Sequence, residues 1–204
     1  MINRMTKIIL ATGNINKLYE IETFMKDCNF EFCCQSEFEI QSCDEPYDTF
    51  VENALMKARH ASKSTGLPAI ADDSGICVDA INGKPGIHSA RYAGPSATNT
   101  DNIEKLLEAL KNEENRKAHF YCSIVFIRNH LDPEPFIAEG LWFGEILNER
   151  RGSNGFGYDS IFYDYKTEKS AAELNHEVKN RISHRGQALQ KLKLKLKIIY
   201  DQEK

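Results

Sequence analysis

The 204-residue sequence contains no apolar run long enough to cross a membrane and no excess of positive charge. Hydrophobic residues make up 41% of the chain and charged residues 27%, a balance that is typical of a folded globular protein. The net charge of −4 argues against a general nucleic-acid-binding protein, which needs a basic face. A small anionic substrate stays possible, because a few lysines and arginines can be concentrated in a cleft. We therefore expect neither a membrane nor a nucleic acid polymer as a partner.

The six cysteines form no Cys-x-x-Cys pair, and no spacing of cysteine and histidine is typical of a zinc site. Free thiols are typical of a reducing compartment. The N-terminal residues 1–4 lead into an apolar run that is too short for a secretory signal peptide. These observations predict a cytoplasmic protein. Cys33 and Cys34 are adjacent and could oxidise, but a strand position is the simpler interpretation.

Strand-like and helix-like segments alternate along the chain, without repeats or low-complexity linkers. Apolar, β-branched and aromatic runs predict strands. These runs are Lys7–Thr12, Phe30–Cys34, Pro68–Ala71, Cys77–Ile81, His119–Arg128 and Phe136–Leu147. The last two runs flank the turn residues 129–135, so we expect them to be antiparallel neighbours. Apolar residues at helical spacing predict helices around Leu18–Met25, Val51–Ala61 and Ile103–Leu110.

Capping boxes predict two helix starts, at Thr49–Glu52 and at Ser170–Glu173. Gly66 and Pro68 end the first of these helices. The tail Lys191–Ile199 alternates Lys and Leu as a strand would, but its residues are strong helix formers and favour a helix. Together the segments predict a single domain, residues 1–204, of the α/β class, with a mixed sheet flanked by helices.

The apolar run Pro68–Ala71 is followed by two adjacent carboxylates, Asp72 and Asp73, and then by Ser74 and Gly75. Neighbouring carboxylates repel each other, and their burial is costly unless they share a cation or a proton. A hard divalent ion with oxygen ligands would meet this need and leave one carboxylate to act on water. The same four residues are good turn formers, so a simple turn is the alternative.

A second polar segment, Thr12–Lys17, connects the first strand to a helix. A helix start offers backbone N–H groups and a positive dipole end to a phosphate, and Lys17 adds a full charge. The spacing is not that of a Walker loop, and an ordinary turn with a solvated lysine is the alternative. Lys57 borders the apolar face of its predicted helix and could point into a cleft instead of outward.

Two further segments suit a planar ligand. Three glycines surround two aromatic residues in Gly152–Asp159, which favours a loop that presents a ring and open N–H groups. In Lys179–Gly186, Ser183 could cap a helix whose first turn carries the donors His184 and Arg185. A flexible surface loop and an exposed basic patch are the respective alternatives. Combined with the carboxylate pair, these are the parts of a nucleotide enzyme that uses a metal.

Six ordered motifs resemble those of the inosine/xanthosine triphosphate pyrophosphatase family, enzymes that hydrolyse noncanonical purine nucleoside triphosphates. They cover the chain from about residue 7 to about residue 190. The motifs are Thr12–Lys17, Phe50–Ala54, Ala71–Gly75, Pro85–Tyr92, Gly155–Asp159 and Ile182–Gly186. The resemblance implies hydrolysis of ITP, dITP or XTP to the monophosphate and pyrophosphate. It also implies Mg²⁺ dependence, a homodimer, and an elongated central sheet in two lobes with the active-site cleft between them.

The resemblance also implies roles for individual residues. Asp73 matches the catalytic base, and Glu45, Asp72 and Asp73 match acidic positions that can hold the metal, with their division of work left open. The positions that match triphosphate contacts are Thr12, Gly13, Asn14, Ile15, Asn16, Lys17 and Lys57. Ser74 matches a substrate contact beside the catalytic base. Phe156, Gly157, Tyr158 and Asp159 match the loop that binds the nucleotide base, and Lys179, His184 and Arg185 match donors to the purine.

The sequence departs from the family pattern at His88, where Tyr is common, and at Ser160, where Pro is usual. Two other functions stay open. One is a pyrophosphatase for modified pyrimidine triphosphates, and the other is a nucleotide-binding regulatory protein without hydrolysis. The acidic set around Asp73 argues against a mere binder, because uncompensated carboxylates repel a triphosphate.

Overall fold

The computed structural model describes residues 6–28, 30–41, 43 and 45–201. Its chain divides into two compact units. Unit 1 consists of the described residues of Met1–Asp73, Ser123–Glu139 and Ala188–Lys204, and unit 2 consists of Ser74–Cys122 and Gly140–Gln187. The prediction about a signal peptide at residues 1–4 lies outside the described residues. The single domain and the cleft between two lobes stay predictions.

Seven strands form one sheet in the order β2-β1-β3-β4-β5-β6-β7. β1 is parallel to β2 and β3, whereas β6 is antiparallel to β5 and β7. The strands are β1 (Thr6–Leu10), β2 (Phe30–Cys34), β3 (Ala69–Val78), β4 (Lys117–Ile127), β5 (Phe136–Ile146), β6 (Phe162–Asp164) and β7 (Lys169–Ser170). The prediction of a mixed sheet flanked by helices is therefore confirmed, and the runs around the turn 129–135 are neighbours in the sheet as expected.

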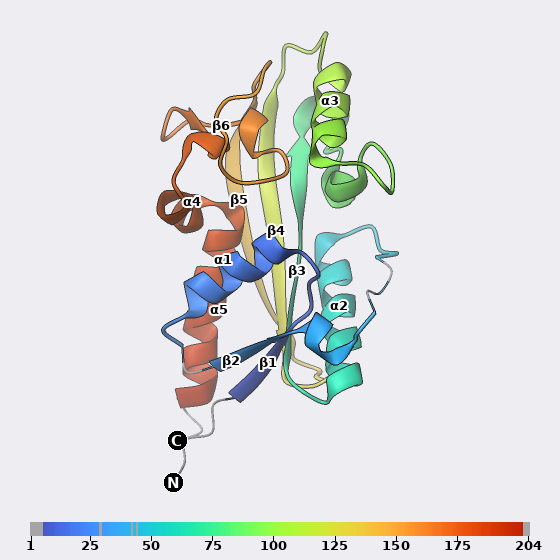
Figure 1. The fold of residues 1–204 in the computed structure, drawn as a ribbon, viewed down its shortest axis with the longest axis vertical. Helices are drawn as coiled ribbons and strands as arrows, with labels where there is room; N and C mark the ends of the chain where they lie inside the picture. The colour runs from blue at the N-terminus through green and yellow to red at the C-terminus, as the bar shows by residue number, and fades with distance from the viewer. Residues whose placement is uncertain (1–5, 29, 42, 44, 202–204) are drawn as a thin grey trace. The chain divides into compact units, whose positions relative to one another are not determined.

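Helices cover both faces of the sheet in unit 1 (Figure 1). These helices are α1 (Ile15–Met25), α2 (Phe50–Thr65) and the greater part of α5 (His184–Asp201). Val125 and Ile127 of β4 pack with the alanines of α2, whereas the intervening Phe126 contacts Tyr200 of α5. Because successive strand residues face opposite sides, α2 and α5 lie on opposite faces. α1 lies beside α5, since Lys193 Nζ donates to the backbone oxygen of Phe24 over 3.0 Å.

The core of unit 2 is rich in aromatic residues, whereas the core between the sheet and α2 in unit 1 consists mostly of small residues. Phe120, Trp142 and Phe162 are buried together, and α3 (Asn99–Ala109) packs on this cluster. The indole N–H of Trp142 donates to the buried carboxylate of Asp164 over 2.8 Å, which satisfies both polar groups inside the core. α4 (His176–Ile182) completes unit 2 together with short 3-10 turns.

The acidic pair does not end a strand. β3 runs unbroken through Asp72, Asp73 and Gly75, so the alternative of a turn at these residues is wrong. A Cβ atom on Gly75 would lie 2.2 Å from the backbone oxygen of Gly86, so this glycine serves close packing of a neighbouring segment and not a turn. Asp79–Ile81, predicted as strand, forms a 3-10 turn.

The two predicted capping boxes had different outcomes. The capping box at Ser170 is present, but it opens the short 3-10 helix Ala171–Glu173, and α4 begins later, after its cap Asn175. Thr49 does cap the start of α2, although Glu52 accepts from the Thr49 hydroxyl, and the tail is helical, as predicted. Thr49 Oγ1 accepts a hydrogen bond from Glu52 N, which satisfies a free donor of the helix start.

Candidate active site

Asp72 and Asp73 point to opposite faces of the sheet, because they are consecutive residues of one strand. Asp72 shares its side with α1, and its Oδ2 lies 3.0 Å from Lys17 Nζ. Asp73 shares its side with α2, and its Oδ1 lies 3.3 Å from Lys57 Nζ. The carboxylate repulsion is therefore relieved by two lysines, one on each face, and not by one shared cation.

Lys57 joins a second carboxylate to Asp73. Its Nζ donates to Glu45 Oε1 over 2.8 Å, so one ammonium group serves Glu45 and Asp73 together. Burial lowers the pKa of Lys57, but the charges of Asp73, Asp72 and Glu45 outweigh this and raise it above the ordinary value. Burial raises the pKa of Asp73 above the usual carboxyl value, against the opposing pull of Lys57 and Lys17. A carboxylate with a raised pKa suits general base catalysis near neutral pH.

Glu45 and Asp73, both on the α2 side of the sheet, suit a metal ion better than the adjacent pair Asp72 and Asp73, which point to opposite faces. Within residues 6–28, 30–41, 43 and 45–201, no three His, Cys, Asp or Glu side chains gather as a ready metal site. Asp73 Oδ2 is buried and accepts no hydrogen bond from the described residues, which is costly for a carboxylate oxygen unless a cation or water binds it. Glu45 and Asp73 already hold a common cation, the ammonium of Lys57. A divalent ion with oxygen ligands fits this pair.

The turn Thr12–Lys17 forms the start of α1, as predicted. Asn14 caps the helix, and its Oδ1 accepts from the backbone N–H groups of Asn16 and Lys17 over 3.0 and 3.3 Å. Thr12 Oγ1 in turn accepts from Asn14 N, while Ile15 is 78% exposed at the helix start. Gly13 lies in the same turn. An anion here would therefore meet Lys17 and the side chains of the turn, and would compete with Asn14 for the two N–H groups.

In unit 2 a buried carboxylate ties the glycine-rich loop to α4. Asp159 Oδ2 accepts from Lys179 Nζ over 2.6 Å and from Phe156 N over 2.8 Å. Lys179 Nζ also lies 4.7 Å from the centre of the Phe156 ring, a cation–π distance. A Cβ atom on Gly155, whose φ is +75°, would approach Asp159 Oδ2 to 2.1 Å, so only glycine fits there. The loop is held by specific contacts and is not a freely flexible surface loop.

The donors His184 and Arg185 are buried at the start of α5, which excludes the interpretation as an exposed basic patch. Ser183 Oγ accepts from Gly186 N over 3.1 Å, so the predicted cap is present. Arg185 Nη2 donates to Ser74 Oγ over 2.9 Å. The imidazole of His184 stacks on Phe120, with ring centres 4.7 Å apart and planes 10° apart. Ser74 directly follows Asp73, so the chain itself joins this cluster to the carboxylates.

Comparison with known proteins identifies the family. A family model described as the Ham1 family matches residues 8–195. The chain belongs to the Ham1 family. It is 50% identical over 190 residues to the dITP/XTP pyrophosphatase of Coxiella burnetii (strain RSA 493 / Nine Mile phase I), covering 92% of this chain and 95% of that protein. It is 52% identical over 188 residues to the dITP/XTP pyrophosphatase of Nitrosomonas europaea (strain ATCC 19718 / CIP 103999 / KCTC 2705 / NBRC 14298), covering 92% and 93%. The solved structure of a HAM1 protein from Coxiella burnetii matches with a TM-score of 0.90 at 49% identity, covering 94% of this chain and 98% of that one.

The family resemblance inferred from the motifs is thus confirmed, and the structure adds residues that the motifs did not reveal. Phe120 supports His184 by stacking, but in the sequence it is one aromatic residue of a strand. Tyr158 is buried, and its hydroxyl donates to the backbone oxygen of Ser89 over 2.9 Å, so it anchors the loop instead of displaying its ring. Gly157 lies beside it in the same loop. No helix among the described residues is long and apolar enough to span a membrane.

Proposed function

We propose that this protein hydrolyses noncanonical purine nucleoside triphosphates, dITP, XTP and ITP, to the monophosphate and pyrophosphate. Membership of the Ham1 family and about 50% identity to two dITP/XTP pyrophosphatases support this function. The observation that best supports it is the direct connection between a carboxylate and a cluster of hydrogen-bond donors. The buried carboxylate of Asp73, with a raised pKa and an oxygen open to a further partner, is followed directly by Ser74, which is bound to Arg185 of a buried donor cluster.

We propose Asp73 as the general base. A base must accept a proton from the attacking water, and Asp73 Oδ2 is the oxygen that Lys57 does not occupy. Lys17 and Lys57 bring two positive charges toward a substrate that carries several negative ones. Fixed cations stabilise the charge that develops on the leaving pyrophosphate. The turn Thr12–Lys17 is proposed to contact the triphosphate.

We propose that Mg²⁺ binds Glu45 and Asp73, and that Asp72 positions Lys17. The support is the split of the two aspartates onto opposite faces and the shared lysine on the side of Asp73. When bound, the ion would neutralise phosphate charge and lower the pKa of bound water.

The purine base is proposed to lie against Phe156 and the buried donors Lys179, His184 and Arg185. Hypoxanthine and xanthine present a carbonyl group at position 6, which can accept hydrogen bonds from such donors. Adenine presents an amino group there, so donors would face donors, a mismatch that costs about 1–3 kcal/mol per unpaired group. Gly157, Tyr158 and Asp159 are proposed to shape this loop.

The homodimer and the cytoplasmic location are proposals that rest on the family resemblance and on the free cysteines, and sedimentation velocity tests the dimer.

The test is pyrophosphate release from dITP, XTP, ITP, GTP and ATP with Mg²⁺, using wild type and Asp73→Asn. Asp79→Asn is a matched control, because Asp79 follows the same strand but is exposed. We expect release from dITP, XTP and ITP and none from ATP, loss of at least about a hundredfold in Asp73→Asn, and no change in the control. GTP shares the carbonyl group at position 6, so it measures whether the pocket rejects the 2-amino group. Faster release from a modified pyrimidine triphosphate would contradict the assigned base, and no release from any substrate would contradict the reaction.

A further inference from the structure

The outward side of α2 carries a hollow that the proposed chemistry does not use. Its volume is about 510 Å³, within the range of small-molecule sites. All its lining residues belong to unit 1. They are Tyr47, Glu52, Leu55, Met56, Arg59, His60, Lys63 and His130. We call this hollow the α2 pocket. Lys57 belongs to the same helix but turns to the carboxylates, so helical spacing separates the pocket residues from the candidate active site.

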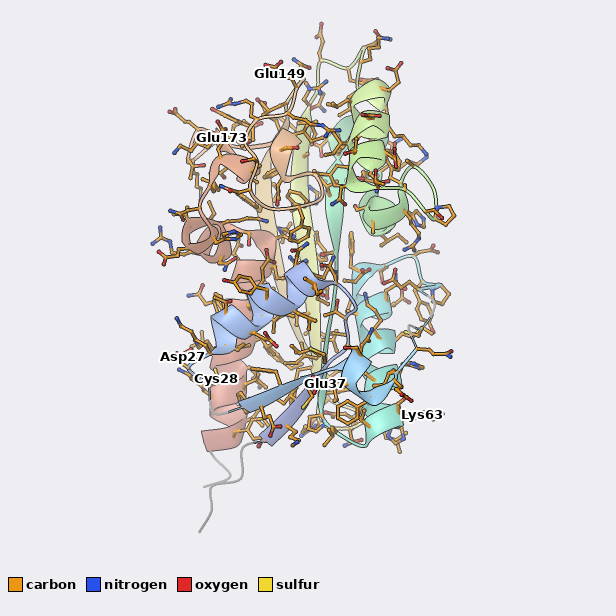
Figure 2. The ribbon with its side chains drawn as sticks, in the orientation of Figure 1. Asp27, Cys28, Glu37, Lys63, Glu149 and Glu173 are labelled. Atoms are coloured by element: carbon orange, nitrogen blue, oxygen red, sulfur yellow. The ribbon has the colours of Figure 1, made fainter. Side chains whose placement is uncertain are left out.

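The charge of the α2 pocket is positive. Arg59 and Lys63 lie one helical turn apart on α2, and both are exposed (Figure 2 labels Lys63 at the end of the helix). Among the residues that the structure describes, neither cation forms an ion pair or a hydrogen bond. Glu52 supplies one negative charge, and its carboxylate is engaged at 2.5 Å by the hydroxyl of Thr49. Two unpaired cations on a chain of net charge −4 favour an anionic ligand.

The rest of the lining is apolar and aromatic. Leu55 and Met56 are half-buried and form an apolar part of the wall, and three planar rings belong to Tyr47, His60 and His130. Planar side chains and a polarisable thioether make good contacts with a flat ring. The pocket therefore suits a ligand that combines a planar ring with a negative group, and it does not suit a bare inorganic ion.

The walls of the α2 pocket are held in place. Asn53 clamps Tyr47, since Tyr47 N donates to Asn53 Oδ1 and Asn53 Nδ2 donates to Tyr47 O, each over 3.1 Å. His60 Nε2 donates to the backbone oxygen of Gln41 over 3.0 Å. On the other wall, the turn that carries His130 is closed by the buried Asp132. A site whose walls are already fixed loses little entropy when a ligand binds.

We propose that the α2 pocket binds a small phosphate monoester that carries a planar ring. Arg59 and Lys63 bind the phosphate, for which the fork of arginine and the ammonium of lysine are both suited. The ring lies between the aromatic side chains and Met56. This binding is independent of the metal and of Asp73, so it stands or falls separately from the proposed hydrolysis.

Phenyl phosphate is the probe, and the methyl group of Met56 is the reporter, observed by ¹³C NMR in the full-length protein with EDTA present. Met56→Leu assigns the signal. We expect a saturable shift of the Met56 signal, an affinity at least about tenfold weaker in the Arg59→Gln/Lys63→Gln variant, and weaker binding of inorganic phosphate. Lys111→Gln, a change of an exposed lysine in unit 2, is the matched control and leaves the affinity unchanged.

Three outcomes overturn the proposal. The first is no shift of the Met56 signal at tens of millimolar phenyl phosphate. The second is equal affinity in the double variant, with the fold of both proteins verified by circular dichroism. The third is a Met56 signal that moves with protein concentration in the absence of phenyl phosphate, which would assign the pocket to contact between copies of the chain. Because Arg59 and Lys63 are exposed, their replacement leaves the fold intact.

Discussion

Replacement of Lys57 by glutamine removes a buried cation from between two carboxylates. Its Nζ lies 3.3 Å from Asp73 Oδ1 and 2.8 Å from Glu45 Oε1. Its side chain is 15% exposed and that of Asp73 is 7% exposed, so solvent screens the pair only weakly. An opposite charge at this distance lowers a carboxyl pKa by roughly 1–3 units. Without it, burial and the remaining negative charges raise the pKa of Asp73 further.

The consequence for activity has a definite sign. The base acts only when it is ionised, so a higher pKa of Asp73 moves the acidic limb of the pH profile to higher pH. We expect the limb of kcat/KM for dITP to move up by roughly 1–2 units in Lys57→Gln. On that limb activity falls about tenfold per pH unit, so at its foot the variant loses roughly 10–100-fold beyond any loss of phosphate contact.

The assay is pyrophosphate release across the pH range for wild type, Lys57→Gln and Lys57→Arg. The arginine variant keeps the charge, so its acidic limb should stay within about half a unit of wild type. Equal profiles for wild type and Lys57→Gln would refute the coupling between Lys57 and Asp73. A limb that moves equally in both variants would show that the shape of lysine matters and its charge does not.

Three further predictions concern the scaffold. Gly75→Ala brings a methyl group within 2.2 Å of a backbone oxygen and should lower the free energy of unfolding by about 1–3 kcal/mol, measured by urea titration. Hydrogen bonds from Arg128 hold the pKa of Asp132 well below its usual range. This carboxylate therefore stabilises the fold above about pH 4, and the stabilisation is lost as pH falls through the lowered pKa. In Asp132→Asn the melting temperature should fall at pH 7 and should change less than that of wild type as the pH is lowered. Phe120→Leu removes the stack on His184 and should raise KM for dITP severalfold with a smaller change in kcat, which steady-state kinetics measures.

Much of the fold was predictable because it depends on local patterns. The capping residues of α2, the helical character of α5 and the mixed sheet follow from propensities and spacing of nearby residues. The turn that was the alternative at Asp72 and Asp73 did not form, for a physical reason. Polar residues followed by glycine usually mark a turn, but here Gly75 lies inside β3 with the segment at Gly86 packed closely against it, and two lysines pair with the carboxylates.

The sequence alone determined to which family the chain belongs and indicated most of the chemical groups proposed for the site, because motif order and residue type can be read directly along the chain. Tertiary structure decided which groups meet. It assigned Lys17 to Asp72 and Lys57 to Asp73, and it placed Phe120 under His184, 64 positions away in the numbering. Such pairings depend on the face to which each side chain points and on which helix covers that face. Strand alternation sets the face to which each side chain points, and helix packing sets which helix covers that face. The packing of helices that are distant in sequence is decided only when the chain folds.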